Sequence, residues 1–290
     1  MPRFAAGRLR RHLDSLYRRY GAGFLDTDPI SFPHRYDGDE DREIVAFLSA
    51  ALAYGRVAQI RESIERLTAI LGPRPAAFVR GFDPRRDGRR LEGFAHRFND
   101  AHDMGLLLWY LKQILGSHGA IEAFFLDGYD ASDGDVGPAL ASFVGRMLHL
   151  DCSPYYRERR LPRSAGVRFF LPSPEAGSCC KRLNLFLRWM VRRSDGVDFG
   201  IWKHVSPAKL VIPLDTHVSR IASYIGLTHR RSIGWKMALE VTDRLRSLDP
   251  DDPIKYDFAL CRLGILDECP RLQDPFKCRC CSLRPVCSLP

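Results

Sequence analysis

Cysteine is absent from residues 1–151 of this 290-residue chain, although the whole chain contains nine cysteines. A secreted disulfide framework would spread its cysteines through the fold, so this absence favours reduced thiols. The chain also lacks a run of 18 apolar residues, and its first residues lack the apolar stretch of a signal peptide. These absences predict a cytoplasmic protein that does not enter a membrane.

Strand-like alternation is also scarce, whereas apolar residues recur at helical spacing through most of the chain. An apolar content of 45% is enough to fill a core. The sequence therefore predicts an all-α fold. Stretches rich in Asp, Gly, Pro and Arg predict exposed loops at 26–41, 81–90 and 127–137. Helices are expected over residues 105–116, 119–127, 138–150, 178–193, 233–248 and 254–264.

Acidic residues are fewer than basic residues: the chain has 35 Asp and Glu and 44 Lys and Arg, which gives a net charge of +9. A polyanionic partner is a reasonable expectation for such a chain. Residues 151–177 interleave arginines with Tyr155, Tyr156, Phe169 and Phe170, a mixture that suits phosphates and stacked bases. A solvated loop anchored to the core by its aromatic residues fits the same pattern equally well.

Five of the nine cysteines lie in the last twenty-two residues, as Cys269, Cys278, Cys280, Cys281 and Cys287. This short, proline-broken segment has little apolar content with which to form a core. Several thiolates can be gathered around one metal centre, so the segment predicts a metal or cluster site.

A second local pattern surrounds Asp215. Val218, Ile221 and Ala222 continue a helical stripe after Leu214-Asp215, which places Asp215 at or near the N-cap of a helix. A plain capping role explains this pattern, and a catalytic carboxylate at a helix N-terminus explains it as well.

Together the two patterns resemble a known superfamily. Val211-Ile212-Pro213-Leu214-Asp215-Thr216-His217-Val218-Ser219-Arg220 is similar to the Val-Asp-Thr-His-Val-x-Arg segment of the helix-hairpin-helix DNA glycosylases, which include endonuclease III. Leu263-Gly264 followed by cysteines resembles the end of that fold, where a Cys-x6-Cys-x2-Cys-x5-Cys loop holds an iron–sulfur cluster. The whole chain also resembles an uncharacterised bacterial family of this superfamily.

The resemblance implies a two-lobed helix-hairpin-helix fold over residues 1–290, with a cysteine-rich loop at its C-terminal end. It divides the chain into a helical lobe at 40–150, the basic and aromatic segment at 151–177, a lobe carrying the hairpin and the aspartate at 178–264, and the cysteine loop at 265–290. It further implies that Asp215 is catalytic, because a carboxylate stabilises the oxocarbenium character that develops when an N-glycosidic bond breaks.

For the cysteines, the resemblance implies that Cys269, Cys278, Cys281 and Cys287 hold a [4Fe–4S] cluster, with zinc as the alternative. The last three match the superfamily spacing, while eight residues rather than six separate Cys269 from Cys278. Cys280 is an extra thiol that could replace a neighbouring ligand.

Two departures restrict the expected chemistry. The phosphate-gripping Leu-Pro-Gly-Val-Gly hairpin of the superfamily corresponds to residues 194–202 here, where Asp195 and Asp198 are expected to repel phosphate. Bifunctional members carry a Schiff-base lysine where this chain has Gly196 or Val197. The expected activity is therefore monofunctional hydrolysis by a nucleoid-associated enzyme that binds double-stranded DNA. The alternatives are a non-catalytic DNA-binding protein with the same fold, or a hydrolase of nucleosides or RNA.

Basic residues near the two motifs are the candidates for DNA contact, although an ordinary solvated face explains them too. The two-lobed arrangement of the superfamily implies that Tyr54-Gly55-Arg56 lines the cleft opposite Asp215. His96-Arg97-Phe98 has no assigned role and also fits a solvent-facing loop. The candidates for DNA contact are Lys181, Arg188, Arg192, Lys203, Lys209, His217, Arg220 and Arg279.

Overall fold

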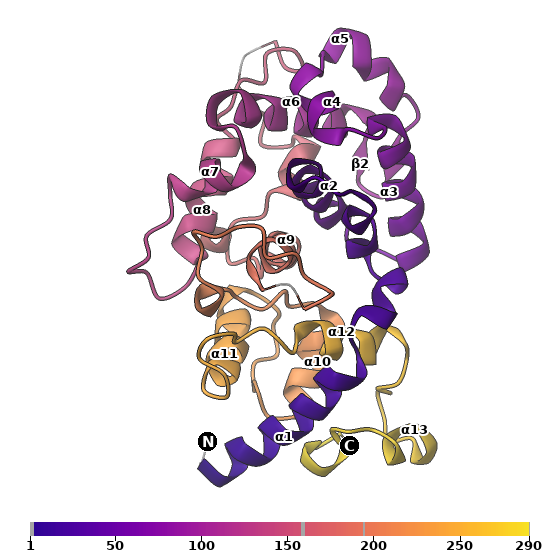
Figure 1. The fold of residues 1–290 in the computed structure, drawn as a ribbon, viewed down its shortest axis with the longest axis vertical. Helices are drawn as coiled ribbons and strands as arrows, with labels where there is room; N and C mark the ends of the chain where they lie inside the picture. The colour runs from indigo at the N-terminus through magenta and orange to yellow at the C-terminus, as the bar shows by residue number, and fades with distance from the viewer. Residues whose placement is uncertain (1–2, 158–159, 194, 290) are drawn as a thin grey trace. The chain divides into compact units, whose positions relative to one another are not determined.

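Helices dominate the computed structural model, which describes residues 3–157, 160–193 and 195–289 (Figure 1). The only paired strands in these ranges are β1 (Ala95–His96) and β2 (Asn99–Asp100), which form a two-stranded antiparallel hairpin. The predicted all-α fold is confirmed at this level. No helix in the described part of the chain is both long and apolar enough to cross a membrane.

The chain divides into two compact units. The middle unit comprises residues 26–176, and the terminal unit combines residues 1–25 with residues 177–290. The N-terminal helix thus belongs with the C-terminal half of the sequence.

The middle unit is built around α2 (Asp39–Ala51), whose residues are buried from Glu43 onward. The buried Glu43 carboxylate accepts hydrogen bonds from the backbone N–H groups of Ile121 and Glu122, both at 2.9 Å, and so satisfies the first donors of α7 (Ile121–Leu126). The other helices of this unit are α3 (Val57–Leu71), α4 (Pro75–Gly81), α5 (Pro84–Asp87), α6 (Ala101–His118) and α8 (Gly137–Met147).

Helix α6 illustrates how the sequence determines these elements. Asp100 and Asp103 form a capping box at its start, and Gly119 ends it with a φ of 79°. Leu106, Leu107 and Leu108 are fully buried, and the range predicted to be helical, 105–116, lies within the helix. By contrast, the exposed loop predicted at 26–41 is wrong in part, because short 3-10 helices bury Ile30 and Phe32 completely.

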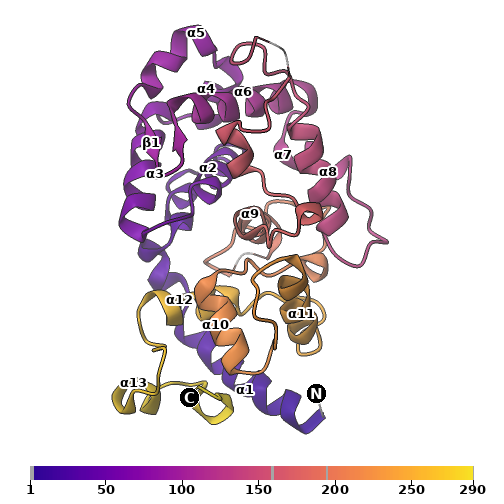
Figure 2. The same cartoon turned by 180° about the vertical axis from the view of Figure 1, so that it is seen from behind.

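The terminal unit packs α10 (Thr216–Tyr224) against α12 (Asp257–Ile265), and the two helices lie side by side in both views (Figures 1 and 2). Helix α1 (Arg3–Arg19) contacts α12 through its apolar stripe, and its Leu9, Leu13 and Leu16 are buried. The remaining helices of this unit are α9 (Lys181–Val191), α11 (Trp235–Arg246) and α13 (Pro275–Arg279).

Helix α9 begins later than a Ser178 cap would place it. Its N-cap is Cys180, in the left-handed region with a φ of 48°, and the Ser178 hydroxyl accepts a hydrogen bond from the Cys180 N–H at 3.2 Å. Residues 195–215, which connect α9 to α10, contain a single short 3-10 helix at Pro207–Lys209. A helix-hairpin-helix with a full second helix is therefore not formed in this connection.

Candidate active site and cysteine cluster

Asp215 is the N-cap of α10, as the sequence predicted. Its Oδ1 accepts hydrogen bonds from the backbone N–H groups of His217 and Val218, both at 2.8 Å. These two donors satisfy Oδ1 and place it at the positive end of the helix. The residue is partly exposed, so this carboxylate is held in one orientation without being sealed in the core.

Helix α12 faces the other oxygen of this carboxylate. Cys261 Sγ lies 4.0 Å from Asp215 Oδ2. Close approach of the two helices depends on Gly264, where an added Cβ would lie 2.5 Å from the Cβ of His217. The two parts of the sequence signature, Asp-Thr-His and Leu-Gly, are therefore in direct contact through His217 and Gly264.

A second carboxyl group lies in the same region and was missed by sequence reasoning. Asp257, at the start of α12, is 2% exposed, and its Oδ1 has no hydrogen-bond partner among the described residues. The pKa of Asp257 is raised to about 6. Burial is the main cause, the negative charges of Asp215 and Asp198 act in the same direction, and Arg188 acts in the opposite direction. The sequence around Asp257 does not reveal that this residue is buried near Asp215, because its burial depends on how α12 packs.

Arg188 of α9 and Arg192, the residue that caps the C-terminal end of α9, connect this carboxyl group to the segment that follows the helix. Arg188 pairs with Asp198, at 3.1 Å from its Nε, and with Asp257 through Nη1. Arg192 pairs with Asp198 as well, and its Nη2 lies 2.9 Å from Asp252 Oδ2. We call Arg188, Arg192, Asp198, Asp252 and Asp257 the buried ion network.

This network corrects two predictions about DNA contact. Arg188 and Arg192 are 1% and 3% exposed, so both guanidinium groups are occupied inside the unit and are not available to phosphates. Asp198 is buried against both arginines, and Asp195 pairs with Arg192 at 3.2 Å. Both aspartates therefore form ion pairs within the unit.

The other candidates for DNA contact have several different surroundings. Arg220 donates to the backbone oxygen of Cys269 at 2.8 Å, and Lys203 donates to the oxygen of Gly200. His217 is partly buried against Gly264. The candidates on the surface are Lys203 and Arg279, which are exposed, and Lys181 and Lys209, which are partly exposed.

The cysteine segment is attached to both helices of the aspartate site. Cys269 N–H donates to Leu263 O at 3.0 Å at the end of α12, and Ser288 N–H donates to Tyr224 O at 2.8 Å at the end of α10. Arg8 of α1 donates to Pro285 O at 2.9 Å. The segment therefore connects three helices of the terminal unit.

Four of its thiols influence one another electrostatically. The pKa of Cys269 is raised to about 11, mainly by burial. Arg220 lowers this pKa, whereas the other thiols that raise it are those of Cys281, Cys287 and Cys278. The pKa of Cys281 is raised in the same direction by burial, Cys287 and Cys278. Cys280, by contrast, is exposed. The four interacting thiols are the four that the sequence selected.

The donor set fits a zinc ion or an iron–sulfur cluster in kind and in number. As the side chains stand, however, no three His, Cys, Asp or Glu residues within 3–157, 160–193 and 195–289 are grouped as a metal ion would require. The thiols do not form a closed coordination shell in this arrangement.

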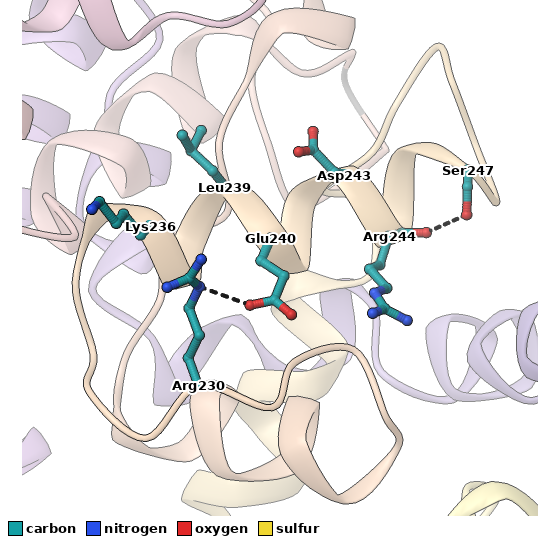
Figure 3. A pocket seen from close by; sticks show the side chains of 7 residues that line it. All are labelled: Arg230, Lys236, Leu239, Glu240, Asp243, Arg244 and Ser247. Atoms are coloured by element: carbon teal, nitrogen blue, oxygen red, sulfur yellow. Dashed lines mark hydrogen bonds and ion pairs between the residues drawn. The ribbon is translucent and has the colours of Figure 1, made fainter. Parts of the chain in front are cut away.

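A separate cavity of about 530 Å³ lies along α11, away from the sequence candidates (Figure 3). Its walls carry both charges, and Arg230 pairs with Glu240 at 2.9 Å. This mixed lining does not identify a ligand class. The lining residues are Arg230, Lys236, Leu239, Glu240, Asp243, Arg244 and Ser247.

Comparison with known proteins gives one match. Residues 28–266 match the model of a family described as "Protein of unknown function (DUF2400)". No curated protein and no solved structure matches the chain. The matched range includes most of the middle unit, Asp215 and α12, and it ends before the cysteine segment.

Proposed function

Because the chain belongs to the DUF2400 family, whose description assigns no activity, we propose a function from the site itself: a monofunctional DNA N-glycosylase that uses Asp215. The observation that carries this proposal is the fixed geometry of the Asp215 carboxylate. Two backbone N–H groups hold its Oδ1, while its Oδ2 faces α12 beside the buried carboxyl group of Asp257. An oriented carboxylate of this kind suits the stabilisation of a developing cation.

The proposed reaction is hydrolysis of the bond between a base nitrogen and C1′ of its deoxyribose. The base leaves with the bonding electron pair, and Asp215 stabilises the positive charge that develops on the sugar. Asp215 accepts a proton from the attacking water, whose oxygen bonds to C1′, and the leaving base takes up a proton. The target base must first leave the helical stack, because its glycosidic bond is otherwise covered.

Hydrolysis without a covalent intermediate is favoured by the residues that precede Asp215. The positions of the superfamily's Schiff-base lysine are Gly196 and Val197, which carry no amine. Lys203, the nearest lysine after them, donates to the backbone oxygen of Gly200. We therefore expect free base and an intact abasic strand as products.

A specific observation favours a second candidate, a DNA-binding protein of the same superfamily without catalysis. The connection 195–215 has no full helix after the turn, so the backbone amides that grip a phosphate in a helix-hairpin-helix are not arranged in that form. Salt-dependent duplex binding with no base release would support this candidate.

Single-turnover assays against duplexes that each contain one modified or mispaired base test the primary proposal. Release of free base from at least one duplex is the expected result. Failure on every duplex, together with retained duplex binding, would instead support the second candidate.

For the cysteine segment, we propose that Cys269, Cys278, Cys281 and Cys287 hold a [4Fe–4S] cluster, with zinc as the alternative. When bound, the group would supply a structural link rather than chemistry, because the segment is attached to α1, α10 and α12. Its neighbouring basic residue Arg279 is exposed and can lie near a phosphate in this proposal.

Replacing Cys281 with serine is expected to abolish metal binding and to lower the stability of the terminal unit, because one of four thiolate ligands is lost. Replacing the adjacent Cys280 with serine is the matched control and is expected to leave metal content unchanged, since Cys280 is exposed. Metal analysis of the purified Cys281→Ser and Cys280→Ser variants tests this expectation. Equal metal content in both variants would contradict the ligand assignment.

The visible absorption spectrum of the wild type identifies the metal. A brown wild-type protein indicates an iron–sulfur cluster, and a colourless zinc-containing protein indicates zinc.

A further inference from the structure

Three aromatic side chains from distant parts of the sequence meet on the middle unit. The ring of Tyr54 is stacked with that of Phe98, with centroids 6.4 Å apart and an interplanar angle of 5°. Phe169 lies edge-on to both, at 4.8 Å from Tyr54 and 5.4 Å from Phe98. We call these three residues the aromatic platform. It combines Tyr54 and the unassigned motif at 96–98 with the aromatic part of segment 151–177.

The platform is open to solvent. Phe98 is 68% exposed and Phe169 is 39% exposed, which places both among the most exposed large apolar side chains of the described residues. Scattered apolar residues are normal on a protein surface, but grouped exposed rings indicate a binding surface.

Hydrogen bonds hold the platform in place. Phe98 is in the turn between β1 and β2, and the Tyr54 hydroxyl donates to His96 O at 2.8 Å and approaches Asn99 Oδ1 at 2.7 Å. His96 Nδ1 lies 2.8 Å from Ser63 Oγ of α3. The hairpin is therefore tied to the neighbouring helix and to Tyr54 on both sides of the exposed ring.

The third ring is fixed by a separate contact. Phe169 belongs to a 3-10 helix, Gly166–Phe170, whose Gly166 O accepts a hydrogen bond from Asn99 Nδ2 at 2.8 Å. Any Cβ at Gly166 would lie 2.2 Å from Asp103 Oδ2, so only glycine allows this approach. The same asparagine thus secures both the hairpin and the segment that carries Phe169.

The exposed turn contains a residue with an unusual backbone conformation. Arg97 adopts a φ of 54°, in the left-handed region that non-glycine residues rarely occupy. Its side chain lies against Gly55, where a Cβ would be 2.7 Å from Arg97 Cδ. Strained residues on a rigid support cluster at binding sites, so the observed strain points to recognition by this turn.

Charge complementarity identifies the partner. The Arg97 guanidinium lies 5.2 Å from the centre of the Phe98 ring, and Arg56, the residue after Gly55, is exposed. Neither arginine forms an ion pair within the described residues. Exposed rings bordered by free guanidinium groups match a strand that has π-faces on its bases and charge on its phosphates.

We propose that the aromatic platform binds unpaired nucleobases of a nucleic-acid strand by stacking on Phe98, with Arg97 and Arg56 contacting the flanking phosphates. A cavity of about 200 Å³ adjoins the turn and is lined by His96, Arg97 and Arg66 together with Glu62. This surface lies wholly within the middle unit and does not use Asp215, so the inference goes beyond the proposed hydrolysis and stands independently of it.

A short single-stranded oligodeoxynucleotide containing one 2-aminopurine tests the proposal with the full-length protein. Binding to the wild type is expected to quench the 2-aminopurine fluorescence, because the base stacks on an aromatic ring. Replacing Phe98 with alanine is expected to weaken binding roughly 5- to 100-fold and to remove the quenching, whereas Phe98→Trp keeps both. Replacing Arg97 with glutamine is expected to weaken binding and reduce its salt dependence while quenching persists in the bound state.

Phe276→Ala is the matched control, because Phe276 is 87% exposed but lies on α13 of the terminal unit. It is expected to bind the oligonucleotide as the wild type does. The proposal is overturned if Phe98→Ala binds and quenches as well as the wild type. Equal losses in Phe98→Ala and Phe276→Ala would also overturn it, as would a wild-type protein that binds fully paired duplex but never quenches the base.

Discussion

Replacing Arg188 with methionine is expected to lower the free energy of unfolding by about 3–5 kcal/mol at neutral pH, as measured by denaturant titration. The Arg188 guanidinium is shared between Asp198 and Asp257, and all three side chains are almost completely buried. Without it, two carboxylates remain in the core with too little positive charge. Methionine fills much of the vacated volume, so the loss reports the missing charge rather than a cavity.

This loss is expected to be smaller at about pH 5 than at about pH 7. Burial raises the pKa of Asp198, and it raises the pKa of Asp257 to about 6, while Arg188 lowers both values. Removing Arg188 therefore raises both pKa values further above those of the unfolded chain. The folded variant then binds more protons than the unfolded variant, so its stability falls as the pH rises through this range.

Arg193→Met is the matched control for this prediction. Arg193 follows the same helix but is exposed, so its replacement is expected to change stability by no more than about 0.5 kcal/mol. Equal stability of the Arg188 and Arg193 variants, or a loss for Arg188→Met that does not depend on pH, would contradict the assignment of Arg188 to the buried ion network.

The burial of the arginines in the buried ion network could not be predicted from the sequence. Helical spacing placed Lys181, Arg188 and Arg192 on one side of α9, and a basic side normally faces solvent. Every residue of α9 from Arg182 onward is nevertheless buried. The partners Asp252 and Asp257 lie about sixty residues further along the chain, and no periodicity within a helix can reveal them.

Local patterns predicted the parts of the site that are themselves local. The apolar stripe after Leu214 was sufficient to identify Asp215 as an N-cap, because capping depends on the next three residues only. The contact between Gly264 and His217 and the burial of Asp257 depend on how α10 and α12 pack, so they emerged only in three dimensions.

The cysteine segment and the aromatic platform differ in the same way. Spacing within a short segment selected four thiols, and the structure places those four within electrostatic range of one another. Tyr54, Phe98 and Phe169 are each more than forty residues apart in the sequence. Nothing in the sequence therefore indicated that their rings are in contact.

Replacing Asp215 with asparagine is expected to lower the rate of base release at least about 100-fold. The amide oxygen of the new side chain can still accept the hydrogen bonds from His217 and Val218, so the helix cap is kept while the negative charge is lost. Stability is therefore expected to change little, and duplex binding is expected to persist. A rate loss of this size would then report stabilisation of the transition state rather than misfolding.

Asp83→Asn provides the matched control. Asp83 is also an N-cap whose Oδ1 accepts two backbone N–H groups, those of Arg85 and Arg86, but it lies on α5 of the middle unit. The same chemical change at this position is expected to leave base release unaffected.

The measurement that tests the central claim most directly is single-turnover base release by the wild type, Asp215→Asn and Asp83→Asn from the same panel of duplexes with modified or mispaired bases. The account predicts release of free base from at least one duplex by the wild type and by Asp83→Asn, with the Asp215→Asn rate at least about 100-fold lower. Equal rates for the wild type and Asp215→Asn, or no release from any duplex, would contradict it.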